Sequence, residues 1–296
     1  MAVGLTLSTT GNMTVGQKIL LGKASQAFEP AAPDPDLVRA ETLPQGHRVY
    51  NSGIFARLSQ ASAVAEADDL SQVEQLVPNY ITIEPSEHGI LVTLSKRARR
   101  RQGDADAARV AGEQMGGSLR RRQSNDIIAI YDTFTKSIAG AAIALDITHF
   151  RGSVAYLMTD NNTSYGPAPM PLHAAFHIEQ ISDIILDVTD PGTAAGNRPT
   201  GPMSDMIKGW WRGNDRLYGI AIFHAGNITR DTANDSKGAL KHQNTIVMVE
   251  EGEAEVTDEV DNSARLTEFG LFKSWGEALQ IDPHGVEVYS DTAATV

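Results

Sequence analysis

The sequence predicts an α+β fold in which extended N-terminal segments precede a long helix and a mixed domain. Three observations predict it: a proline-rich start without a core of its own, strand-like alternation near residues 80–94, and a helical apolar stripe over residues 104–136. With 296 residues, of which 41% are hydrophobic and 21% charged, the chain can bury one large core or two moderate ones.

Residues 1–45 are poorly suited to a core. They contain four prolines and many small or polar residues, and their one apolar cluster is Ile19-Leu20-Leu21. A segment that cannot bury enough apolar surface stays disordered or docks on something else. We therefore predict an extended arm.

Residues 46–95 predict a long two-stranded excursion. Short strand pieces lie between residues 48 and 56, Tyr80–Glu84 alternates as strands do, residues 85–89 resemble a turn, and Ile90–Leu94 forms a second strand. An isolated ribbon is only marginally stable in water, so we expect it to rest on a neighbour.

Residues 104–136 carry the clearest helix signal. Apolar positions recur every three or four residues along one stripe, which consists of Ala108, Ala111, Met115, Leu119, Gln123, Ile127, Tyr131 and Phe134. Gly116-Gly117 interrupts the stripe at a cost of roughly 1 kcal/mol per glycine relative to alanine. We predict a bend or a break there.

Strands and helices alternate after residue 140. We expect a helix over 147–159, with Phe150, Val154, Leu157 and Met158 on one side. A second helix is expected over 178–188, ending at Asp190-Pro191-Gly192, and a third from Ser204-Asp205 through Trp210-Trp211. Strands are expected over 172–176, 217–224, 245–249, 266–279 and 286–289.

The composition excludes several classes of protein. The chain has no cysteine, so disulfides, thiolate metal sites and cysteine nucleophiles are absent. No apolar run is long enough to span a membrane, and the start does not resemble a secretory signal. A net charge of −12 disfavours a surface that attracts nucleic acid.

The charge is distributed unevenly. Nine of the 25 basic residues lie between Lys96 and Arg122, whereas Glu250–Asp261 holds seven acids and no base. Such blocks are usually solvated faces, but they are also suited to meeting across a subunit boundary, where they would set its register. The candidate inter-subunit residues are Arg97, Arg99, Arg100, Arg101, Arg120, Arg121, Arg122, Glu250, Glu251, Glu253 and Glu255.

We find no motif that predicts catalysis, a cofactor or a metal. Gly11–Lys18 superficially resembles a phosphate loop, but its lysine is one place late and no Ser or Thr follows. His173 and His177 would suit zinc on a helix, yet on a strand they lie roughly 13 Å apart. Trp210-Trp211 is more typical of packing than of ligand stacking. We predict a protein that is not an enzyme.

The order of segments, together with several local stretches, resembles a known family. These stretches are Tyr80–Ile83 through Gly89–Arg97, Met170–Gln180, Gly219–Ile228 and His284–Tyr289. The pattern resembles the Hong Kong 97-type major capsid proteins of tailed bacteriophages and, more distantly, the encapsulins. The likeness covers most of the chain, although each motif alone is weak.

The resemblance implies an N-terminal arm (1–45), an extended loop (46–95), a peripheral domain with a spine helix (96–139 and 262–296) and an axial domain (140–261). It implies a virion protein, assembled in the host cytoplasm into pentamers and hexamers of an icosahedral shell. That shell would enclose double-stranded DNA without sequence-specific binding, and scaffold, portal and decoration proteins are its implied partners.

The chain departs from some members of this family in two features. Some family members join subunits covalently through a lysine of the extended loop, but residues 46–95 contain none, so we predict no such cross-link. The arm is too short to hold a fused scaffold, so we predict a separate scaffold or none.

The alternative functions are an encapsulin-like compartment shell and an α+β enzyme whose site is assembled only in space.

Overall fold

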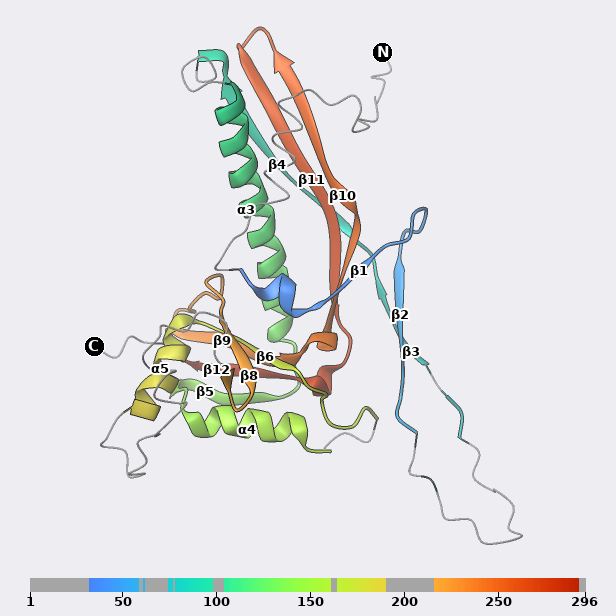
Figure 1. Ribbon diagram of the computed structural model, residues 1–296, viewed down its shortest axis with the longest axis vertical. Coiled ribbons are helices and arrows are strands. Elements are labelled where there is room, and N and C mark those ends of the chain that lie inside the picture. The colour runs from blue at the N-terminus through green and yellow to red at the C-terminus, as the bar shows by residue number, and fades with distance from the viewer. Residues whose placement is uncertain are drawn as a thin grey trace.

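The computed structural model describes residues 32–58, 61, 74–76, 78–97, 104–160, 164–189 and 216–292. A long four-stranded sheet lies beside one long helix, a six-stranded sheet with two shorter helices occupies the other end, and a two-stranded ribbon projects to one side (Figure 1). The structure thus combines helices with mostly antiparallel sheets, which is consistent with the predicted α+β class.

The four-stranded sheet has the order β1-β10-β11-β4. Its strands are β1 (Arg39–Thr42), β10 (Ile246–Asp261), β11 (Leu266–Leu279) and β4 (Ser86–Ser95). β1 runs parallel to β10, and the other pairs are antiparallel. The predicted strand over 266–279 matches β11, whereas the strand predicted over 245–249 continues through the whole acidic block as β10.

Helix α3 (Asp104–Tyr131) covers one face of this sheet. All eight residues of the predicted stripe are buried, including Phe134 just beyond the helix end. The helix continues without interruption through Gly116-Gly117, so the predicted break is wrong. Gly116 is buried, and burial of the apolar stripe against the sheet outweighs the modest propensity penalty of the two glycines.

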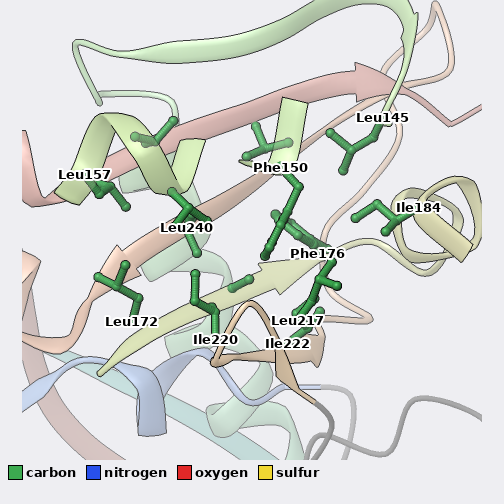
Figure 2. Packing of buried hydrophobic residues seen from close by; sticks show 14 of the residues in the cluster. Leu145, Phe150, Leu157, Leu172, Phe176, Ile184, Leu217, Ile220, Ile222 and Leu240 are labelled. Carbon is green, nitrogen blue, oxygen red and sulfur yellow. The ribbon is translucent and has the colours of Figure 1, made fainter. Parts of the chain in front are cut away.

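The six-stranded sheet has the order β5-β12-β9-β6-β8-β7. These strands are β5 (Ser137–Ala144), β12 (Gly285–Asp291), β9 (Asp235–His242), β6 (Leu172–Phe176), β8 (Ile220–His224) and β7 (Arg216–Leu217). Leu145, Phe150 and Ile184 pack with strand residues such as Phe176 and Leu240 in one apolar core (Figure 2).

Two helices border this core, as the sequence predicted. Helix α4 (Ile147–Met158) is capped by Asp146, whose carboxylate accepts a hydrogen bond from the His149 N–H at 2.6 Å. Met158 is exposed, so it does not belong to the buried side. Helix α5 (Ile178–Thr189) directly follows β6, as expected.

Three strand predictions need correction. The segment over 217–224 is a hairpin of β7 and β8, because Tyr218 and Gly219 take positive φ values of 53° and 81°. β5 and β9 were not predicted. Residues 85–89 are no turn, because β4 begins at Ser86 and pairs with β11 rather than with the preceding strand.

The ribbon instead pairs β2 (Tyr50–Phe55) with β3 (Pro78–Ile83) in antiparallel register. The two-stranded excursion predicted within 46–95 therefore exists, but with a different partner strand. β10 and β11, which lie on either side of the domain boundary predicted at 261/262, pair with each other, and β12 joins the six-stranded sheet.

The N-terminal segment is partly anchored. Residues 34–37 form the short helix η1 (Asp34–Leu37), β1 pairs with β10, and Ala32, Leu37, Val38 and Leu43 are buried. A coreless arm therefore does not describe residues 32–43. The segment over 11–18 that superficially resembles a phosphate loop, the predicted helix stop at 190–192 and the predicted helix over 204–211 lie outside the described residues.

Candidate subunit-contact surfaces

The predicted basic residues occupy two places. Arg97 lies exposed just after the end of β4, and Arg99–Arg101 lie outside the described residues. Arg120, Arg121 and Arg122 lie on α3. Arg120 pairs with Asp36 of η1, and Arg122 pairs with Asp126 at 2.9 Å. Arg120 and Arg122 therefore already have acidic partners within the subunit.

The predicted acidic residues face two sides of the sheet. Glu250 lies opposite Trp275, which packs against α3, and its carboxylate accepts hydrogen bonds from Lys273 at 2.6 Å and Gln123 at 3.1 Å. Glu251 and Glu255 lie opposite Ser274 and Phe272, whose side chains alternate onto the other face. The fold does not bring these two glutamates to the arginines of its own α3.

The face opposite α3 carries an open acidic groove of about 460 Å³. Its lining consists of Pro85, Glu87, Glu251, Glu253, Glu255, Phe272, Lys273 and Ser274. Among the described residues, none of the four glutamates forms an ion pair. Like charges at this spacing repel one another, so the groove is suited to a basic partner rather than to nucleic acid.

The ribbon of β2 and β3 has little core of its own. Ile83 packs with Leu43, Val247 and Val249 at its base. Farther out, Phe55 is 58% exposed and Tyr80 is 63% exposed. Exposed aromatic side chains on a marginally stable ribbon are suited to burial against a partner.

Polar contacts near the end of β2 also tie the ribbon to the rest of its own subunit. The Arg57 backbone N–H donates to the Ser164 carbonyl at 2.6 Å, and the Arg57 guanidinium pairs with Asp160 at 2.9 Å. Both side chains of this ion pair are about half exposed, at 52% and 53%, so the pair contributes little stability.

A buried polar cluster fastens η1 to the body of the subunit. The Asp34 carboxylate accepts hydrogen bonds from Ser124 Oγ at 2.7 Å and from Tyr131 OH at 2.8 Å. Lys241 Nζ donates to the Leu37 carbonyl at 2.5 Å. Burial raises the pKa of Asp34 and lowers the pKa of Lys241 to about 8, and each charge partly offsets the other's shift.

No sequence pattern singled out this cluster in advance. Lys241 belongs to β9, a strand that was not predicted, and Asp34 belongs to a segment expected to be extended. The one available signal is Asp34-Pro35, since an acidic residue and a proline are both favoured in the first turn of a helix.

The described residues contain no group of three or more His, Asp or Glu side chains that could hold a metal ion. His173 lies on β6 and His177 just after it, as the strand interpretation required. Burial lowers the pKa of both imidazoles. Within the described ranges, no helix is both long enough and apolar enough to cross a membrane.

Comparisons with known proteins give the fold. No protein-family model matches the sequence, and no curated protein matches it. A chain from the head structure of Helicobacter pylori bacteriophage KHP40 is similar in structure, with a TM-score of 0.68 and 11% identity, over 98% of this chain and 99% of that one.

Two further solved structures agree over nearly the whole length. Mycobacterium phage Che8 gives a TM-score of 0.62 at 12% identity, covering 97% of this chain and 98% of that chain. The capsid structure of the cyanophage P-SCSP1u gives 0.62 at 13% identity, covering 98% and 94%. The chain therefore has the fold of these phage head and capsid subunits, which confirms the predicted Hong Kong 97-type α+β fold.

Proposed function

We propose that this chain is a major capsid protein that self-assembles into the icosahedral shell enclosing a phage double-stranded DNA genome. The observation that carries the proposal is the shared fold, which extends over at least 94% of both chains in the three comparisons given above. An assembly function also accounts for exposed aromatic residues on a ribbon with almost no core.

In this shell the ribbon of β2 and β3 reaches over an adjacent subunit. The four-stranded sheet and α3 form the peripheral domain, and the six-stranded sheet forms the axial domain that points toward the five- and six-fold axes. Many weak contacts, repeated by symmetry, then stabilise the particle. Assembly takes place in the host cytoplasm with a separate scaffold or none, and portal and decoration proteins complete the virion.

The predicted charged residues act between subunits in this proposal. Glu251, Glu253 and Glu255 are exposed and form no ion pair with described residues, so a neighbour's basic segment, including Arg99–Arg101, is their proposed partner. Glu250, Arg120 and Arg122 already have partners inside the subunit, so their share in such a contact is smaller.

Electron microscopy of the purified chain, expressed alone and with candidate scaffold proteins of the same phage, tests the proposal. We expect closed icosahedral shells. A discrete dimer or tetramer under every condition would instead favour an enzyme. Particles isolated with an enzyme cargo and no genome would favour the encapsulin-like compartment.

A further inference from the structure

β4 is an open edge of the four-stranded sheet. It pairs with β11 on one side, and no strand of the described chain pairs with its other side. The pairing continues from Ser86 to Ser95 without a bulge. Residues 89–95 contain neither a charge nor a proline. Natural sheet edges are usually protected by such features, so this edge is built like one that has a partner.

The other edge strands of the two large sheets are shorter or less regular than β4. β1 has four residues, two of them charged, and β7 has two residues. β5 has a register shift against β12, and Ala139 and Ala142 take positive φ values of 69° and 58°. Short or irregular edges are poor templates for strand addition. Among the described edges of the two large sheets, β4 alone is long and regular.

The backbone groups that face outward can be assigned from the ladder. The Lys96 N–H donates to the Arg265 carbonyl at 2.9 Å, one step beyond the Ser95–Leu266 pair. Hydrogen-bonded positions alternate along an antiparallel pair. The N–H and C=O groups of Leu91 and Thr93 therefore point away from β11.

The apolar side chains of β4 are also less well buried than those of the neighbouring strand β11. Ile90, Val92 and Leu94 pack against α3, yet each remains partly exposed. On the next strand, Phe269 and Leu271 pack against the same helix and are 3% and 1% exposed. On the opposite face, Leu91 is 58% exposed. The apolar surface thus continues past the last strand of the subunit.

We propose that the β4 edges of two copies of this chain pair antiparallel around a two-fold axis at Leu91. The pairing joins two four-stranded sheets into one sheet of eight strands and places both α3 helices on the same face. A two-fold interface uses the same patch on both copies, and the central Leu91 contacts its counterpart directly. The inference rests on the proposed self-assembly and names one of its contacts.

Charge supports this occupant and this register. With Leu91 opposite Leu91 of the partner subunit, Glu87 lies opposite Ser95 of the partner subunit, the last residue of β4. Arg97 of the partner subunit follows two residues later, where the chain has left the strand for a helical turn, so the two opposite charges lie at the same end of the contact. Both residues are exposed, and neither forms an ion pair with described residues. Two such pairs, one at each end, disfavour a parallel arrangement, which would place like charges together.

Single cysteines test the register, because the chain has none of its own. Leu91→Cys places two thiols across the axis at about 5.5 Å between Cα atoms, within disulfide range. Thr93→Cys is the matched control on the same strand and face, where the two Cα atoms lie roughly 14 Å apart. Under mild oxidation of assembled particles, we expect nearly all Leu91→Cys chains at this contact to run as dimers, and Thr93→Cys chains as monomers.

Equal cross-linking of the two variants, or none from Leu91→Cys in intact particles, overturns the proposal. If Leu91→Cys prevents assembly, reversing the charges of Glu87 and Arg97 tests the pairing instead. Glu87→Arg and Arg97→Glu should each lower the yield of sedimenting particles at least tenfold, and the double variant should restore it; wild-type yields from both single variants refute the pairing. The proposed shell function fails separately, when wild-type chain forms no particles although Leu91→Cys dimers form.

Discussion

Replacement of Asp34 by alanine should destabilise the subunit strongly. The change leaves Lys241, which is 1% exposed, without its counter-charge, and it removes the hydrogen-bond acceptor of Ser124 Oγ and Tyr131 OH. Removal of one partner from a buried pair costs about 3–5 kcal/mol, because the remaining charge stays desolvated. At about 2–4 °C per kcal/mol, the melting temperature of the unassembled chain should fall by on the order of 10 °C.

Thermal unfolding of unassembled subunits, followed by circular dichroism, measures the effect. Asp36→Ala is the matched control, since Asp36 belongs to the same short helix but pairs with Arg120 at an exposed site, where the loss should stay below about 1 kcal/mol. Lys241→Met in the Asp34→Ala background should recover part of the loss. Equal effects of the two alanine variants would refute the reasoning.

Three further predictions concern other parts of the chain. Burial raises the pKa of Glu277 to about 7, above its unfolded value of about 4.5, so its ionisation should destabilise the fold as the pH rises between these values. Urea unfolding should show that Glu277→Gln is about 1 kcal/mol more stable than wild type at pH 8, after discounting for partial exposure, and equally stable at pH 4. The same effect at both pH values would contradict this prediction. Gly238→Ala would place a Cβ 2.6 Å from Phe176 Cδ1 in the six-stranded sheet, and we expect a loss of about 1–3 kcal/mol, whereas Gly152→Ala meets open space on α4 and should cost nothing in the same assay. Because residues 46–95 contain no lysine, particles boiled in detergent should release monomers on a gel, and a ladder of covalent oligomers would disprove that expectation.

Local patterns predicted the elements whose environment repeats along the chain. The stripe on and just beyond α3 identified eight buried positions correctly. The buried side of the helix keeps one period along its length, although its packing partners change from the four-stranded sheet to η1 and β9. The predicted bounds of β6 and β11 match the structure, and the proline before β6 marked its start. β9 escaped prediction because it is buried on both faces and shows no alternation.

The sequence by itself therefore determined the type of most elements, the buried side of α3 and a chain order that resembles capsid proteins. Only the tertiary structure decided that β4 pairs with β11, that β2 pairs with β3, and that Asp34 and Lys241 share a buried site. The reason is physical: periodicity depends on near neighbours in the chain and reports which face is buried, but it carries no information about the distant strand or charge that does the burying.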